Sequence, residues 1–283
     1  MKRTATRYRN IALEVCAWLL GIIMMLPIYI MIVNSFKGRK EIFTNTFGLP
    51  DSWSFAFYAK AMEKMNFLTA FKNSLIVTAI SICLIIIFAA MTSWMLVRMN
   101  NKLANLILLV FVATMLIPFQ SVMIPLMQYM SSWDIPAIGF SMVNTHYGLI
   151  FMYIGFGLSM SVFLYHGFIK GVPVALEEAA MIEGCNKWQT FWKIVFPMLI
   201  PITMTVGILN LLWIWNDYLL PSLTLSSPTL RTIPLSTFFF FGEFTIQWNL
   251  AMAGLVVSII PVIIFYLFAQ KYIIKGVMAG AVK

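Results

Sequence analysis

The most informative polar residues of this chain lie in one segment between two long apolar stretches. Glu177 and Glu178 are followed by two alanines, and Gly184 ends the segment. Two small side chains beside a carboxylate suit a docking surface, because a partner can approach them closely, and a glycine permits a sharp change of direction. Helix physics alone fits an ordinary amphipathic loop helix equally well. The segment therefore indicates either a docking site for another protein or a plain loop helix.

Two short helices are expected around these residues. Pro173 suits a first helical turn because its missing N–H would have no partner there, and the two glutamates would face the positive end of the helix dipole. Gly184 is a natural helix stop. Asn186 and Gln189 have the spacing of a capping box, which predicts that a second helix begins directly after the glycine.

Residues that could carry catalysis or hold a metal are not grouped in the sequence. It contains no G-x-x-x-x-G-K-[ST] phosphate loop, no H-E-x-x-H motif and no G-x-S-x-G motif. The three cysteines, Cys16, Cys83 and Cys185, lie in apolar runs or in the polar loop, so we expect free thiols. We therefore expect no catalytic residue, no metal site and no cofactor in this chain.

The composition indicates a protein that is embedded in a lipid bilayer. Of its 283 residues, 61% are hydrophobic and only 10% are charged, whereas a soluble domain carries about 25% charged residues. The net charge of +9 fits Lys and Arg side chains that flank membrane spans. Nucleic-acid binding is not expected, because no basic stripe with interleaved aromatic residues occurs.

The expected fold class is all-α, a polytopic membrane protein with six transmembrane helices. Each of six apolar stretches is near the ~20 residues that a span requires. They lie at Ile11–Phe36, Phe71–Val97, Leu103–Met130, Tyr147–Phe168, Ile194–Pro221 and Trp248–Tyr272. Proline residues such as Pro118 and Pro201 can bend the helices that contain them.

The basic residues predict how these helices are oriented. If the N-terminus is cytoplasmic, most Lys and Arg residues lie on the cytoplasmic side, as the positive-inside rule requires. Both termini and the loop 169–193 would then be cytoplasmic. The domain organisation that follows is an N-terminal tail at 1–10, a membrane domain at 11–272 that includes the loop, and a C-terminal tail at 273–283.

The polar segment resembles the EAA signature of binding-protein-dependent ABC importer permeases. The signature reads E-A-A-x3-G-x9-I-x-L-P, and its spacing is matched by Glu178, Ala179, Ala180, Gly184, Ile194 and Pro197. Phe196 stands where the pattern prefers leucine, which exchanges one apolar side chain for another. Other segments resemble the carbohydrate-uptake branch, in particular its shorter, maltose-transporter-type second permease subunit. These segments include Asn34-Ser35-Phe36-Lys37, Trp215-Asn216-Asp217-Tyr218 and the C-terminal tail with Gly280 and Lys283.

The resemblance implies a type I ABC importer permease fold and a division of labour among several proteins. A second permease subunit would complete the translocation path, an ATPase dimer would bind ATP and Mg²⁺, and an external solute-binding protein would deliver a sugar, for which an oligosaccharide is expected. The EAA residues, together with Glu177, would couple this chain to the ATPase, and Gly280 and Lys283 are candidate further contacts. The location implied is the cytoplasmic membrane of a bacterium or archaeon, and the chain itself is not expected to be an enzyme.

The fifth apolar stretch carries a polar stripe that could line the path of the sugar. Asn210, Trp213 and Asp217 lie on one helical face, and sugars are held by hydrogen bonds and by stacking on aromatic rings. The alternative for Asn210 is a hydrogen bond that joins two helices. The alternative for Trp213 is the aromatic belt at the membrane interface.

Two other classes of protein were weighed on the residues. An ion-coupled secondary transporter usually needs an ionisable side chain near the centre of a span, and the sequence places none there. A membrane-embedded enzyme would need a paired acid–base group, and none is found. The residues therefore favour an importer permease.

Overall fold

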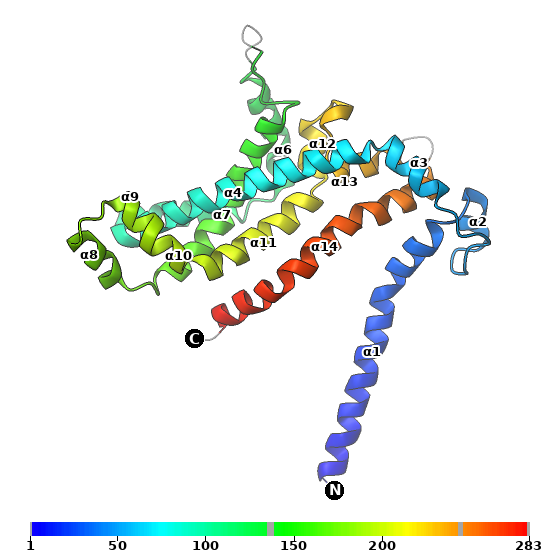
Figure 1. Ribbon diagram of the computed structural model, residues 1–283, viewed down its shortest axis with the longest axis horizontal. Helices are drawn as coiled ribbons and strands as arrows, with labels where there is room; N and C mark the ends of the chain where they lie inside the picture. The colour runs from blue at the N-terminus through cyan, green and yellow to red at the C-terminus, as the bar shows by residue number, and fades with distance from the viewer. Residues whose placement is uncertain (1, 135–138, 243–245, 282–283) are drawn as a thin grey trace. The chain divides into compact units, whose positions relative to one another are not determined.

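The computed structural model describes residues 2–134, 139–242 and 246–281, and their secondary structure is helical (Figure 1). Within these ranges the only β-type pairing is an isolated bridge between Phe241 and Ile246. Four helical segments are long and apolar enough to cross a membrane: Leu13–Asn34, Phe67–Met99, His146–Ile169 and Trp248–Leu267. Two bent helix pairs raise the number to six if each pair forms one span. The prediction of an all-α protein with several membrane-spanning helices is confirmed, with four to six spans.

The chain divides into two compact units. Unit 1 comprises Met1–Phe67 and Ser236–Pro261, and unit 2 comprises Leu68–Leu235 and Val262–Lys283. The helices of unit 1 are α1 (Lys2–Asn34), α2 (Arg39–Thr44), α3 (Ala56–Lys64) and the first part of α14 (Trp248–Ala281). The short helix α13 (Ile233–Phe238) crosses the boundary between the units.

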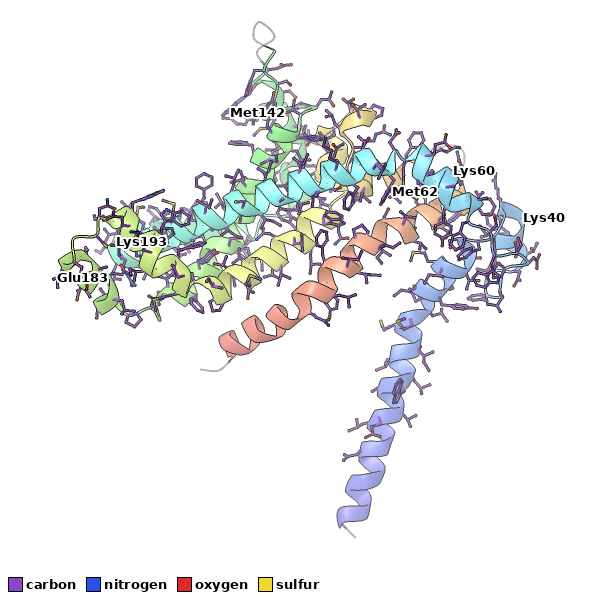
Figure 2. The ribbon with its side chains drawn as sticks, in the orientation of Figure 1. Lys40, Lys60, Met62, Met142, Glu183 and Lys193 are labelled. Atoms are coloured by element: carbon purple, nitrogen blue, oxygen red, sulfur yellow. The ribbon has the colours of Figure 1, made fainter. Side chains whose placement is uncertain are left out.

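Unit 1 is organised by the loop that follows α1. The Lys37 side chain is fully buried, and its ammonium group donates hydrogen bonds to the carbonyl oxygens of Asn45 and Gly48. A buried cation needs such partners, because desolvation without them is costly. The ring of Phe36 packs against Trp53 and Tyr58. Lys40 and Lys60, on α2 and α3, also belong to this unit (Figure 2).

Unit 2 is built around α4 (Phe67–Met99, in this unit from its second residue), α7 (His146–Ile169) and α11 (Ile200–Asn216). α4 contains no proline, and its helix is continuous. A Cβ atom on Gly157 of α7 would lie 2.5 Å from Ile85 Cδ1 and 2.9 Å from Asn210 Oδ1. The glycine therefore allows α4, α7 and α11 to approach closely, as small residues do between membrane helices.

The third and fifth predicted spans are each divided by a bend near a proline, as expected for helices that contain Pro118 and Pro201. α5 (Lys102–Thr114) and α6 (Phe119–Ser131) meet at 103°. Pro118 precedes α6 in an extended conformation, and a proline disfavours helical geometry at the residue before it. The segment Lys187–Met198 meets α11 at 77°, where Pro201 lacks the N–H that would continue the helical hydrogen bonds.

Candidate coupling site and polar stripe

The EAA segment forms a helical hairpin at one end of unit 2 (Figure 1). Its first helix is α8 (Val174–Ile182), and its second is α9 (Lys187–Thr190). The turn contains Gly184 with φ +89°, a conformation that favours glycine. The capping box is present, because Asn186 Oδ1 accepts from the Gln189 N–H at 2.8 Å and Gln189 Oε1 accepts from the Asn186 N–H at 2.9 Å. Both predicted helices are confirmed.

The first three signature residues of α8 divide between two faces. Glu178 and Ala179 are exposed, whereas Ala180 is buried against the unit. Ile182 at the end of α8 is 87% exposed. Its apolar neighbours Val174, Leu176 and Met181 are exposed as well. A cluster of large apolar side chains on a polar hairpin is typical of a protein–protein contact.

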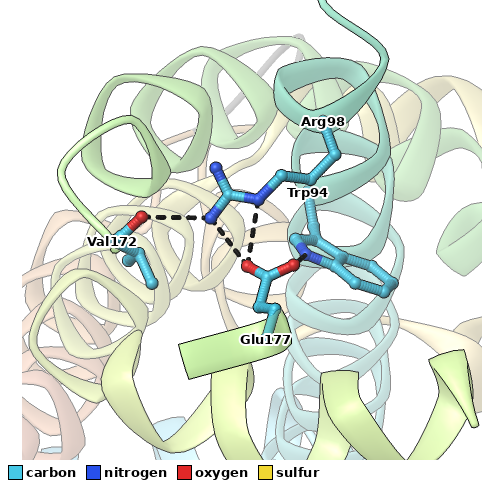
Figure 3. Close-up of polar contacts among 4 residues, drawn as sticks. All are labelled: Trp94, Arg98, Val172 and Glu177. Carbon is cyan, nitrogen blue, oxygen red and sulfur yellow. Dashed lines mark hydrogen bonds and ion pairs between the residues drawn. The ribbon is translucent and has the colours of Figure 1, made fainter. Parts of the chain in front are cut away.

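Glu177 has a different environment from its neighbour Glu178. Its side chain is buried, and Oε1 accepts hydrogen bonds from Arg98 Nη2 at 2.6 Å and from Arg98 Nε at 3.0 Å (Figure 3). Trp94 Nε1 donates to Oε2 at 3.0 Å. Arg98 Nη2 also donates to the Val172 carbonyl at 3.1 Å. The carboxylate is therefore held by charge-assisted bonds to α4.

The sequence did not predict these partners of Glu177. Trp94 lies near the end of the second apolar stretch, and Arg98 directly follows it as one of the basic residues that flank the predicted spans. Their distance along the chain from Glu177 leaves no local pattern. The sequence analysis placed Glu177 among the residues that would couple to an ATPase. In the structure, its carboxylate is hydrogen-bonded to Arg98 and Trp94 of α4.

The two later signature residues lie on the connection from the hairpin to α11. Ile194 is part of η2 (Phe191–Val195), a π-helical turn, and Pro197 lies in α10 (Phe196–Met198). The Phe196 N–H bonds the carbonyl of Phe191, five residues earlier. Glu183 of the hairpin and Lys193 of this connection lie at the same end of unit 2 (Figure 2). The signature therefore covers both the hairpin and the turn that joins it to α11.

The polar stripe of α11 faces α7. Asn210 is buried, and its amide nitrogen donates to Ser161 Oγ of α7 at 3.1 Å. Tyr153 of α7 donates its hydroxyl hydrogen to Asp217 Oδ2 at 3.0 Å. The rings of Tyr153 and Trp213 form an edge-to-face pair with centroids 5.5 Å apart. For Asn210, the geometry is that of a residue that joins two helices.

One member of the stripe remains accessible. Trp213 is 42% exposed and lines a cavity of ≈ 720 Å³ between α5, α6 and α7. The hydroxyl groups of Thr114 and Ser159, 2.7 Å apart, lie in the same wall. The other lining residues are mainly methionine, phenylalanine and aliphatic side chains. The structure thus separates Trp213 from Asn210, although the sequence placed them on one stripe.

Residues 81–278 match the family model of the binding-protein-dependent transport system inner membrane component. The chain belongs to this family. The resemblance to importer permeases, first drawn from the EAA segment, is confirmed.

Two relatives and one solved structure illustrate how far the likeness to this permease extends. The probable starch degradation products transport system permease protein AmyC of Thermoanaerobacterium thermosulfurigenes is 47% identical, with 93% of this chain and 95% of AmyC covered. The melibiose/raffinose/stachyose import permease protein MelC of Bacillus subtilis is 33% identical, with 91% of each covered. A chain from the crystal structure of a bacterial ABC transporter involved in the import of the acidic polysaccharide alginate has 20% identity and a TM-score of 0.80, covering 94% of the permease and 96% of that chain.

These relatives are transport permeases, so the prediction that the chain is a membrane transport subunit and no enzyme is confirmed. In the described part of the permease, no group of three or more His, Cys, Asp or Glu side chains could hold a metal ion. The predicted contact at Lys283 lies outside the described residues. Gly280 lies near the end of α14.

Proposed function

We propose that this permease is one half of the translocation path of an ATP-driven importer for oligosaccharides. AmyC and MelC, which cover nearly the whole chain, are named for starch degradation products and for raffinose-type sugars. The higher identity to AmyC favours short α-linked glucose oligosaccharides, for which maltotriose is a suitable probe. The permease would lie in the cytoplasmic membrane of a bacterium or archaeon, with both termini and α8 in the cytoplasm.

The observation that carries the proposal is the exposed face of α8. Glu178 and Ala179 are exposed on this face, and the exposed apolar side chain of Ile182 lies near them on the same helix. A cavity of ≈ 400 Å³ lies beside them, between α8 and the end of α4. A surface that combines exposed apolar side chains with a carboxylate suits an ATPase subunit, which would bind ATP and Mg²⁺ because this sequence has no phosphate loop.

Two further partners complete the proposed importer. A second permease subunit would close the cavity at Trp213, whose ring could stack on a sugar, and Asp217 would lie at the edge of the same path. An external solute-binding protein would deliver the sugar, in keeping with the family's description. An ion-coupled secondary transporter is disfavoured, because the chain belongs to a family of binding-protein-dependent transport systems.

The experiment tests α8 in the assembled complex of this permease with its second permease subunit, the ATPase and the binding protein. Glu178→Lys reverses the exposed charge, and Gly184→Val places a β-branched residue at φ +89°, which strains the turn. We expect both variants to remain in the membrane while ATPase co-purification and maltotriose uptake fall about tenfold or more, because a like-charge contact costs several kcal/mol.

The matched control is Glu63→Lys, the same charge reversal on exposed α3, which should leave both readings unchanged. Normal ATPase binding and uptake by Glu178→Lys and Gly184→Val would contradict the proposed coupling site. If the ATPase binds but no maltotriose enters through the unsubstituted complex, the substrate class is wrong and the coupling site stands.

A further inference from the structure

We propose that Glu177 is a positioning residue that fixes α8 to α4, so that a movement of α8 is passed directly into α4. The contacts of Trp94, Arg98, Val172 and Glu177 are called the α4–α8 lock below (Figure 3). The inference rests on the proposed function, because it assumes that an ATPase moves α8. It assigns Glu177 a different task from that of the exposed residues beside it.

Both oxygens of the Glu177 carboxylate already accept hydrogen bonds within the chain. One oxygen accepts from two nitrogen atoms of Arg98, and the other accepts from Trp94. The residue is only 4% exposed. An ATPase that docks on α8 would therefore contact Glu178 on the exposed face, and Glu177 would serve the internal contact.

α4 contacts both α8 and the π-helical turn η2 that follows the hairpin. Besides its hydrogen bond to Glu177, Trp94 packs its ring against Phe191 of η2, with centroids 5.3 Å apart. One residue earlier, Ser93 Oγ donates to the Val162 carbonyl of α7 at 2.9 Å. A short stretch of α4 is thus joined to α8, to η2 and to α7 by different kinds of contact.

Glu177 and Arg98 connect α8 to α4 across a long distance in the sequence. The hairpin continues covalently into α7 on one side and toward α11 on the other, whereas Arg98 is 79 residues away from Glu177 along the chain. The hydrogen bonds of Glu177 to Arg98 and Trp94 give α8 a direct polar connection to α4. Two Arg98 nitrogens donate to Oε1 of Glu177 and Trp94 donates to Oε2, so charge-assisted bonds restrain the carboxylate in both distance and direction. Chains of such contacts can carry coupling between sites.

The test compares transport with ATP hydrolysis in proteoliposomes that contain the whole importer. Glu177→Gln keeps the size of the side chain but removes its charge. We expect the ATPase to remain bound and active, while maltotriose taken up per ATP hydrolysed falls about fivefold or more, the lower end of typical coupling between sites. The exchange Arg98→Glu with Glu177→Arg restores an ion pair and should recover most of the ratio. Glu183→Gln, an exposed charge on the same hairpin, should leave the ratio unchanged.

A second measurement, cysteine labelling, follows the movement of α8 and α4 directly and needs no sugar. Cys185 reports on the hairpin, and Met99→Cys reports on the end of α4, with Cys16→Ser and Cys83→Ser removing the other thiols. Trapping the ATPase with ATP and vanadate should change the maleimide labelling rate at both positions. In Glu177→Gln, we expect the change at Cys185 to persist and the change at Met99→Cys to shrink. A merely structural role would reduce both changes together.

The outcomes separate the two proposals. Full changes at both reporters and an unaltered uptake ratio in Glu177→Gln would overturn the lock and leave the coupling site intact. No change at Cys185 in the otherwise unsubstituted complex would count against the proposed function, and the lock would fall with it. If Glu177→Gln does not assemble, Trp94→Phe keeps the ring contact and removes only the N–H donor, and a fully retained ratio in that variant would contradict the inference.

Discussion

The hairpin and the polar stripe of α11 use polar residues in opposite ways. On the hairpin, α8 exposes Glu178 and a set of apolar side chains. Asn210 of α11 and Asp217, which directly follows α11, are instead hydrogen-bonded to side chains of α7. In a membrane an unsatisfied polar group is costly. Asn210 and Asp217 therefore join segments of the chain, whereas Glu178 is left exposed.

The largest expected effect would test the contrast between two neighbouring glutamates. Arg98→Ala leaves the buried Glu177 carboxylate without its ion pair, and we expect a loss of about 3 kcal/mol in stability, the usual cost of an unpaired buried charge. Glu178→Ala should change stability by less than about 0.5 kcal/mol, as is usual at the surface. Thermal unfolding of the purified permease in detergent measures both. Equal effects would remove the distinction between the buried and the exposed carboxylate.

A smaller effect is expected where α11 packs against α7, and two glycines of α7 provide the comparison. Gly157→Ala forces a Cβ atom against Ile85 and Asn210, and such overpacking costs about 1–3 kcal/mol. Gly155→Ala meets no atom within 4 Å and should stabilise the helix by up to about 1 kcal/mol. Thermal unfolding of the two variants in detergent measures both changes in stability. A destabilising Gly155→Ala or a neutral Gly157→Ala would show that these helices do not pack as described.

The smallest expected effect separates two members of the stripe by their consequences for transport. Trp213→Ala should raise the KM for maltotriose about twofold to tenfold, the range that one aromatic contact provides. Asn210→Ala should leave KM unchanged and cost about 0.6 kcal/mol of stability, an average hydrogen bond between membrane helices. Uptake at graded sugar concentrations, with unfolding measured in parallel, checks both. A higher KM in Asn210→Ala would return that residue to the substrate path.

Local patterns in the sequence predicted the hairpin well. The capping box of Asn186 and Gln189 and the turn at Gly184 depend on residues within three positions of each other, so their spacing is readable directly. The prolines at the two bends were also visible, but the angles of 103° and 77° depend on what the helices pack against. The sequence therefore indicated that these spans can bend, but not by how much.

Contacts between distant segments could not be predicted. The pairing of Arg98 with Glu177 joins positions 79 residues apart, and no periodicity connects them. Periodicity placed Asn210 and Trp213 on one stripe, yet it could not show that Asn210 bonds Ser161 while Trp213 lines a cavity. The same limit applies to the EAA residues, since their spacing indicated docking but not that Ala180 is buried while Ala179 is exposed.

The π-helical turn at Phe191–Val195 sets the rotational phase between the hairpin and α11. Such a turn holds one residue more than an α-helical turn would. Since each residue advances a helix by about 100°, deleting a single position there would swing Glu178 and Ile182 toward another side of the molecule. The direction in which the exposed side chains of α8 point thus depends on one extra residue in the π-helical turn.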